Sequence, residues 1–559
     1  MPLARHIDPD DLIARLHDAH LTENGRRIRQ KMVTSHLTPY GTKYASEAEA
    51  PKYQIPKEGT PSDTVYQLIH DELDLDGKPN LNLASFVQTY MEPNATQLMT
   101  ENLSKNLADN DEYPAMISLH ERCVSILAHL WGAKKGEKSV GTATTGSSEA
   151  IHLGGLAMKR RWQERRMAKG LDTCHPNIIM GANAQVALEK FARYFDVEAR
   201  ILPVSKESNY RLDPNQVRKS IDENTIGVFV IMGSTYTGHY EPVEEISKIL
   251  DEYEEKTGHD IPIHVDAASG GFVAPFTHAQ AGGPKWNFDL PRVKSINASG
   301  HKYGLVYVGI GWVVWRDESY LPQYLVFELH YLGGTEKSFT LNFSRPGAQV
   351  AVQYYNLIHL GLEGYREIVE NCLRNARLLS KSLEATGWYT CASDIHRRPS
   401  AGVVAGAKKA VLGGEGETSA DYAAGLPVVA FRLTDEFRRE FPHVRQEWVS
   451  VLMRARQWII PNYALPPAED ATEILRVVIR ESMSLDLLDR LIADLVSVTQ
   501  TLIDNDEVDL SIVQKQKPVG DSRPRTEEEE VGPKKGGESG SKESAQAPRL
   551  AEGIHRSVC

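Results

Sequence analysis

At 559 residues, the chain is long enough for two or three domains and at least one large buried core. A hydrophobic content of 41% and a charged content of 25% are typical of a globular protein. The formal net charge of -12 argues against a surface that neutralises phosphate backbones, so we expect no nucleic-acid partner.

The cysteines and the amino-terminal segment favour a cytoplasmic protein. The five cysteines are widely spaced and form no C-x-x-C pair, which is typical of reduced thiols rather than of a disulfide framework or a zinc site. His17 and His20 could share a helix face, but no further ligands join them, and no metal is predicted. Asp8, Asp10 and Asp11 interrupt the apolar stretch that a signal peptide needs. No apolar run is long enough to span a bilayer, so we expect no membrane partner.

Residues 1–80 contain too little apolar sequence for an independent core, and we predict an arm that makes oligomer contacts. From residue 81 onward, short apolar runs alternate with helical patterns, which predicts a large α/β domain over residues 81–372. Continuous apolar strands are typical of a mostly parallel sheet covered on both faces. The predicted strands are Pro176–Met180, Ile226–Met232, Ile261–Asp266, Val293–Ser299 and Gly309–Trp315, and the predicted covering helices are Glu149–Lys169 and Val243–Lys256.

A helix-rich link, Gln349–Thr386, leads to a predicted smaller α/β C-terminal domain over residues 373–508. Residues 401–425 are rich in Gly and Ala and predict an inserted surface loop. Residues 509–559 are rich in Lys, Glu, Gly, Ser and Pro, so they cannot bury enough apolar surface to fold alone, and we predict a disordered tail. The strand candidates of the smaller domain are Leu426–Leu433 and Ile474–Ile479.

Two charged residues follow predicted buried strands. Lys302 lies just after Ser299, with Gly300 before it and Gly304 after it. Burial lowers the pKa of a lysine and makes its neutral amine available for a Schiff base, whereas a solvated surface lysine is the alternative. Asp266 ends a second strand, where an unpaired carboxylate is costly and needs a cation or an open cleft. A protonated pyridine nitrogen is a suitable cation.

A third motif, the small-residue segment Gly141–Gly146, leads into a predicted helix. The free N–H groups at a helix N-terminus favour a phosphate, and the hydroxyls of Ser147 and Ser148 add donors. A simple helix cap with Glu149 in the first turn is the alternative, and the Gly-Lys-Ser/Thr ending of a Walker loop is missing. Together the three motifs specify a phosphate cup, a carboxylate for a ring nitrogen and an amine for an aldehyde, which are the requirements of pyridoxal phosphate.

The order of these motifs resembles that of the fold-type-I pyridoxal-phosphate decarboxylases, and more narrowly that of the glutamate decarboxylase family. The resemblance runs from about Asn80 to about Asp489. It implies a large domain with a mostly parallel sheet, a smaller C-terminal domain, and α-decarboxylation of L-glutamate to 4-aminobutanoate (γ-aminobutyrate) and CO2. The most family-specific stretches are Asn82–Phe86, Gly146–Ala150, Lys190–Tyr194, Thr235–Gly238, His264–Gly271, Ser299–Lys302 and Asn342–Pro346.

The resemblance also implies roles for single residues. Lys302 would hold the cofactor as a Schiff base, His301 would contact its phosphate and lie near the bond being cleaved, and Asp266 would meet the ring nitrogen. Arg476 would bind the substrate α-carboxylate, and Arg480 is the alternative if the strand register slips. The other implied cofactor contacts are Ser147, Ser148, Gln185, Thr235, Ala268 and, from a neighbouring subunit, Ser344, with Asn183 in the same region. The implied distal substrate pocket contains Ser85, where many relatives carry Thr, and Phe86, Asn106 and Asp109.

A site completed by Ser344 of a neighbouring subunit implies a homodimer or a higher homo-oligomer. The tail lacks tryptophan and carries an acidic run, so calmodulin binding is not supported. A related activity on aspartate or cysteine sulfinate, a carbon–carbon lyase and a catalytically silent scaffold are the alternatives. The intact set of Lys302, Asp266, Ser147 and Ser148 argues against the scaffold, which has no need of all of them.

Overall fold

The computed structural model describes residues 54–57, 59–108, 111–277, 283–329, 336–398 and 418–505. The chain divides into two units between Lys78 and Pro79. In the first unit the described helix is α3 (Ser62–Leu73), which begins after Pro61. Most of the predicted arm, the predicted tail and residues 399–417 of the predicted insert lie outside the described residues.

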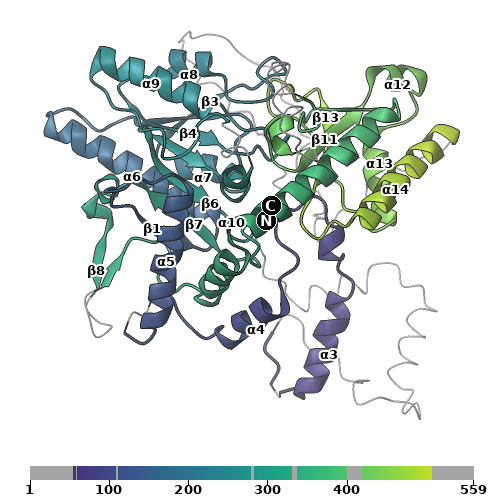
Figure 1. Ribbon diagram of the computed structural model, residues 1–559, viewed down its shortest axis with the longest axis horizontal. Coiled ribbons are helices and arrows are strands. Elements are labelled where there is room, and N and C mark those ends of the chain that lie inside the picture. Colours follow the sequence, from purple (N-terminus) through teal and green to yellow (C-terminus); the bar gives the residue numbers. More distant parts are fainter. Residues whose placement is uncertain are drawn as a thin grey trace, which may run out of the picture. The chain divides into compact units, whose positions relative to one another are not determined.

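A seven-stranded sheet forms the centre of the second unit, with strand order β1-β7-β6-β5-β4-β2-β3 (Figure 1). Strands β3, β2, β4, β5 and β6 pair in parallel, whereas β7 is antiparallel to both of its neighbours. The prediction of a mostly parallel α/β sheet is therefore confirmed. The strands are β1 (Val140–Thr144), β2 (Asn177–Gly181), β3 (Glu198–Leu202), β4 (Thr225–Ile231), β5 (Ile263–Asp266), β6 (Val293–Ala298) and β7 (Gly311–Trp315).

Helices cover both faces of this sheet. Along β4, Val228 and Val230 pack in a cluster with α5, α9 and α10 (Ala348–Ala385), whereas Phe229 and Ile231 pack in a cluster with α6 and α7. Successive strand residues point to opposite faces, so the consecutive apolar side chains of residues 228–231 serve both faces of the sheet. The helices are α4 (Pro93–Glu101), α5 (Pro114–Leu130), α6 (Ser147–Ala168), α7 (Val186–Tyr194), α8 (Pro214–Ser220) and α9 (Val243–Thr257).

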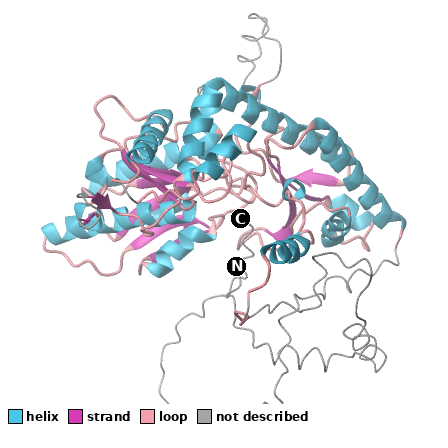
Figure 2. Ribbon diagram, turned by 90° about the horizontal axis from the view of Figure 1, so that it is seen from below, coloured by secondary structure: helices cyan, strands magenta, loops and turns pink. Residues whose placement is uncertain are grey.

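A second, four-stranded antiparallel sheet has the order β10-β11-β13-β12 and its own apolar cluster. Figure 2 displays the two groups of strands apart from each other, each flanked by helices. Helix α10 (Ala348–Ala385) contributes to both clusters and changes direction at Gly361, whose φ of 60° is readily adopted only by glycine. The remaining elements are β8 (Phe327–Leu329), β9 (Glu336–Ser338), β10 (Tyr389–Cys391), β11 (Val428–Leu433), β12 (Asn462–Ala464), β13 (Glu473–Val478), α12 (Asp435–Glu440), α13 (Gln446–Ala455) and α14 (Leu485–Asp504).

Two strands of the large sheet were not expected from the sequence. β1 lies in the segment interpreted as a lead into a helix, and its Gly141 is required because a Cβ there would lie 2.5 Å from the Val313 carbonyl oxygen. β3 is an edge strand with exposed positions such as Ile201, so it lacks the continuous apolar pattern of the buried strands. Among the described residues, no helix combines the length and apolar character needed to cross a bilayer.

Candidate active site

The predicted site residues gather where β5 and β6 end, beside the N-terminus of α6. β5 ends at Asp266, and β6 is followed by a tight turn in which the Lys302 N–H donates to the Ser299 carbonyl at 3.2 Å. The carboxyl ends of parallel strands are where ligands bind in sheets of this kind. Local sequence therefore brings a carboxylate and an amine to the same edge of the sheet.

An aromatic ring links the lysine to an arginine of the second sheet. The Lys302 Nζ lies 5.2 Å from the centroid of the Phe86 ring, and the Arg476 guanidinium carbon also lies 5.2 Å from it. Phe86 is buried, and Arg476 is only 2% exposed. The fold thus brings an amine and a guanidinium to one apolar ring, although they come from different sheets.

The Asp266 carboxylate is buried and held by two donors. Its Oδ1 accepts hydrogen bonds from the Asn297 side-chain amide at 2.9 Å and from the Ala268 N–H at 3.1 Å. Burial raises the pKa of Asp266 above its ordinary value, while the Asn297 bond and the positive charge of Lys302 oppose that shift. A carboxylate in this position is stabilised by a further cation placed against it.

The hydroxyl-rich end of the site lies at the first turn of α6. The Ser147 and Ser299 hydroxyls are 2.7 Å apart, and Ser148 is exposed in the same turn. A Cβ on Gly146 would lie 3.2 Å from Cε1 of His301, so the imidazole packs closely against the start of the helix. Burial, followed by the charge of Lys302, lowers the pKa of His301 to about 4, and its imidazole is therefore neutral near pH 7.

The two predicted arginines have different surroundings. Arg476 donates from Nη1 to the Thr235 carbonyl at 2.6 Å and from Nη2 to the Ala84 carbonyl. Arg480 instead donates to the carbonyls of Val87 at 2.6 Å and Asn82 at 2.9 Å. Because only Arg476 is also in contact with the Phe86 ring in the described structure, the strand register favours Arg476 over Arg480 as a pocket residue.

Three other predicted residues, Ser85, Gln185 and Asn183, each make a side-chain hydrogen bond within the fold. Ser85 accepts the Val87 N–H at 3.1 Å beside Phe86, whereas Gln185 caps α7 by accepting the Ala187 N–H. Asn183 is buried and donates to the Glu241 carboxylate at 3.0 Å.

A separate pair joins Asn106 to Ser344, whose side chains are 3.4 Å apart in an exposed position. Asp109 lies outside the described residues.

Three contacting residues were not predicted. Ser299 shares a hydrogen bond with Ser147, and Asn297 holds Asp266. Glu149, named above only in the alternative of a simple helix cap, accepts N–H bonds from Thr145 at 2.9 Å and from Leu341 at 3.1 Å. The sequence signal for Asn297 and Ser299 was their place at the end of a buried strand, next to the lysine.

The residues present fit pyridoxal phosphate. Within the described structure, Nδ1 of His301 and Nε of Arg476 are buried polar atoms without a hydrogen-bond partner, so both can serve a bound group. The buried Asp266 carboxylate suits a protonated ring nitrogen, and Ser147 at the N-terminus of α6 suits a phosphate. Together with the strand order, this set places the protein in the class of fold-type-I pyridoxal-phosphate enzymes.

Comparison with known proteins narrows that class. Residues 53–399 match the pyridoxal-dependent decarboxylase conserved domain. A glutamate decarboxylase of Saccharomyces cerevisiae is 51% identical over 82% of this chain and 80% of its own length, and one of Petunia hybrida is 45% identical over 85% and 88%. The solved structure of a Lactobacillus brevis glutamate decarboxylase matches with a TM-score of 0.73 and 38% identity, over 83% of this chain and 97% of that one. The chain belongs to the pyridoxal-dependent decarboxylase family and, within it, to the glutamate decarboxylases.

Proposed function

We propose that this protein removes the α-carboxylate of L-glutamate to form 4-aminobutanoate and CO2, with pyridoxal phosphate bound at Lys302. The observation that carries the proposal is the approach of Lys302 and Arg476 to the same Phe86 ring in a member of the glutamate decarboxylase family. The Lys302 amine, which would bind the cofactor, and the Arg476 guanidinium, which would bind a carboxylate, therefore lie against the same ring. A silent scaffold is disfavoured because the fold uses only the two terminal nitrogens of Arg476 and leaves its buried Nε without a hydrogen-bond partner in the described structure.

The cofactor is held by residues of both strand ends and of α6. Ser147, Ser148 and His301 would bind its phosphate, and the Asp266 carboxylate would accept a hydrogen bond from the protonated ring nitrogen. When bound, pyridoxal phosphate takes up the electron pair that departing CO2 leaves behind. Gln185, Thr235 and Ala268 line the ring.

The substrate is oriented by Arg476. Its two terminal nitrogens are fixed on the Thr235 and Ala84 carbonyls, so the guanidinium has one position in which its buried Nε can donate to the α-carboxylate. Lys302 Nζ, or His301, returns a proton to the substrate Cα after CO2 has left. The distal carboxylate lies among Ser85, Phe86, Asn106 and Asp109.

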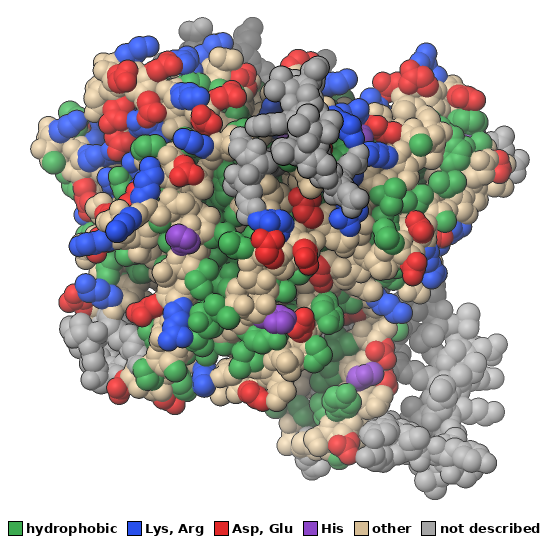
Figure 3. Space-filling view, in the orientation of Figure 1, with side chains coloured by type: hydrophobic (Ala, Val, Ile, Leu, Met, Phe, Trp, Pro, Cys, Tyr) green, Lys and Arg blue, Asp and Glu red, His purple; other side chains and the backbone are tan. Residues whose placement is uncertain are grey.

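The protein acts as a homodimer or a higher homo-oligomer. Ser344 and Asn106 complete the site from a neighbouring subunit. Exposed apolar side chains between residues 341 and 362 support such an interface, with exposed fractions of 48% for Leu341, 60% for Ile358 and 56% for Leu362. Figure 3 displays hydrophobic side chains gathered over α4, α5 and the first half of α10. Burying such a surface against a second copy is favourable.

The organisation of the chain is part of the same proposal. An arm over residues 1–80 adds oligomer contacts, a cofactor-binding domain spans residues 81–372, a small domain spans residues 373–508, and residues 509–559 form a tail. The protein works in the cytoplasm.

The test is the release of CO2 and 4-aminobutanoate from L-glutamate by the purified full chain, with and without added pyridoxal phosphate. Product is expected only with the cofactor, and Lys302→Ala should abolish it. Lys138→Ala, which removes a surface lysine paired with Glu318, is the control and should keep full activity. If borohydride traps the cofactor on Lys302 but glutamate gives no product, the substrate assignment is wrong, and aspartate and cysteine sulfinate are tested next.

A further inference from the structure

Behind Asp266 lies a line of buried polar side chains that the proposed reaction does not use directly. Ser295 Oγ is 2.7 Å from His264 Nδ1, and His264 Nε2 is 2.7 Å from Asn297 Oδ1. The Asn297 amide then donates to Asp266 Oδ1 at 2.9 Å. None of the four side chains is more than 4% exposed, so no solvent competes for these bonds.

The ionised carboxylate fixes the direction of every bond in this line. An ionised Asp266 only accepts, so the Asn297 NH2 group must face it and the Asn297 carbonyl oxygen must face His264. Nε2 of His264 therefore carries the proton and donates, which leaves Nδ1 of the neutral ring as an acceptor for the Ser295 hydroxyl. All three bonds then donate toward Asp266, and bonds aligned in this way strengthen one another.

Packing keeps His264 in place and neutral. A Cβ on Gly154 of α6 would lie 2.4 Å from His264 Nδ1, so only glycine leaves room for the imidazole there. The Phe229 ring meets His264 edge-on, with centroids 5.5 Å apart. Burial lowers the pKa of His264 to about 4, so the ring remains a neutral link at pH values well above 4.

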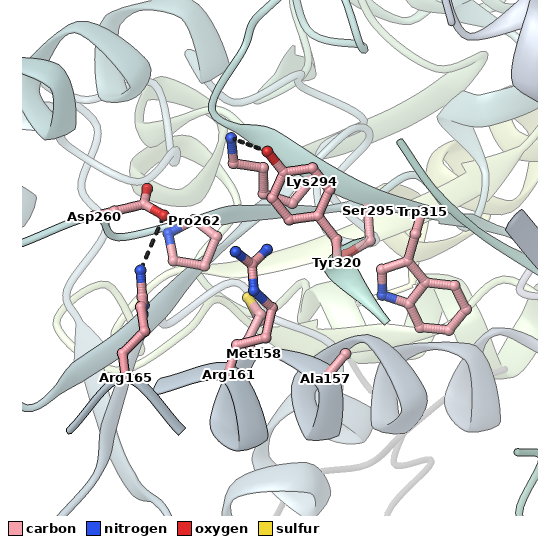
Figure 4. Close-up of a pocket in the computed structure, with 10 residues that line it drawn as sticks. All are labelled: Ala157, Met158, Arg161, Arg165, Asp260, Pro262, Lys294, Ser295, Trp315 and Tyr320. Carbon is pink, nitrogen blue, oxygen red and sulfur yellow. Dashed lines mark hydrogen bonds and ion pairs between the residues drawn. The ribbon is translucent and has the colours of Figure 1, made fainter. Parts of the chain in front are cut away.

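The outer end of the line borders a small cavity. Ser295 lines this cavity of about 10 Å³ together with Arg161, Lys294, Arg165 and Asp260 (Figure 4). Arg165 is paired with Asp260 at 2.9 Å, and Lys294 donates to the Tyr320 hydroxyl at 3.1 Å. The charged groups that act on Asp266 at the inner end are Lys302 and Glu241.

We propose that Ser295, His264 and Asn297 form a hydrogen-bond relay that keeps Asp266 ionised, and that they are positioning residues for the ring nitrogen of pyridoxal phosphate. The inference rests on the role of Asp266 in the proposed function. The relay offsets the burial of the carboxylate, because each donor that points toward Asp266 favours its charged form. Removing the Ser295 hydroxyl leaves His264 Nδ1 without its hydrogen-bond donor and weakens the two hydrogen bonds that follow toward Asp266.

The test uses the holoenzyme without substrate and two readouts: the dissociation constant of pyridoxal phosphate and the 15N chemical shift of its labelled ring nitrogen. Ser295→Ala should raise the dissociation constant about threefold, the effect of weakening one hydrogen bond, and move the shift toward that of a neutral pyridine. Ser295→Thr restores a hydroxyl and should restore both readouts. The matched control is Ser380→Ala in the second half of α10, which removes an equally buried hydroxyl that donates to the Ala376 carbonyl.

Asp266→Asn separates the relay from the proposed role of Asp266. In that background Ser295→Ala should change neither readout, because the relay acts through the carboxylate. If Asp266→Asn itself leaves the ring-nitrogen shift unchanged, the proposed role of Asp266 fails. If Asp266→Asn moves the 15N shift, but Ser295→Ala changes the dissociation constant and the shift no more than Ser380→Ala does, the proposed relay is wrong. An equal effect of Ser295→Ala in both backgrounds also overturns it.

Discussion

Replacing Arg476 by lysine separates its structural role from its role in substrate binding. Arg476 donates to two backbone carbonyls, those of Thr235 and Ala84, and has a third donor, Nε, left for the substrate. A lysine has a single nitrogen and cannot reproduce this fork. Arg476→Lys therefore loses at least one charged hydrogen bond within the fold, at a cost of about 1.5–3 kcal/mol in the free energy of unfolding.

The substrate loses a comparable contact in the same variant. One charged hydrogen bond to the α-carboxylate, worth about 2 kcal/mol, corresponds to a rise in KM of about thirtyfold. Because the bond to CO2 is then poorly oriented, kcat should fall as well. Steady-state kinetics with L-glutamate and urea unfolding measure the two effects on one preparation.

Arg480→Lys is the matched control. Arg480 donates to the carbonyls of Val87, Asn82 and Pro79, so its replacement should cost a similar amount of stability. Its KM should stay within about twofold of wild type, since no contact joins it to the Phe86 ring in the described structure. A larger rise in KM for Arg480→Lys than for Arg476→Lys would refute the assignment and favour the other register.

Three further substitutions test the site. Asp266→Asn should still bind cofactor but lower kcat by several powers of ten in the CO2-release assay, and near-normal turnover would contradict its role at the ring nitrogen. Burial raises the pKa of Glu241 from 4.5 to about 7, so between these pH values the folded protein keeps a proton that the unfolded chain has released. The free energy of unfolding should therefore fall by at most about 3 kcal/mol as the pH rises from 4.5 to about 7. Glu241→Gln should flatten this pH dependence in urea unfolding. Gly154→Ala should weaken cofactor binding by displacing His264, whereas Gly155→Ala, which crowds Phe191 at 2.5 Å, should cost a similar 1–3 kcal/mol of stability and leave cofactor affinity unchanged in absorbance titrations.

Residues at strand ends could be predicted because their signal is local. Asp266 ends one predicted strand, Lys302 follows another within four residues, and Ser147 starts a helix after small residues, so neighbouring sequence was enough to place them. The information that distinguishes Arg476 from Arg480 does not lie in the neighbouring sequence. It depends on the pairing of β13 with β11, in which Arg476 lies opposite Ala430, and that register is set by contacts between distant segments.

The residues that support the site were harder to find for a related reason. His264 and Asn297 lie inside buried strands, where a polar residue is most simply interpreted as a satisfied part of the core. Their function depends on which neighbour each one meets across the sheet. The pairing of β5 with β6 places His264 opposite Ser295 and Asp266 opposite Asn297, and this pairing cannot be read from either strand alone.

Helix α6 connects the two ends of the cofactor site. In the proposed function its first turn supplies Ser147 and N–H groups for the phosphate. Gly154, two turns later, gives His264 the space from which the imidazole reaches Asn297. A shift of α6 along its axis would therefore change the phosphate contacts and the support of Asp266 together. Only Gly154 takes part in this coupling, because a Cβ on the neighbouring Gly155 would meet the Phe191 ring of α7 and not His264.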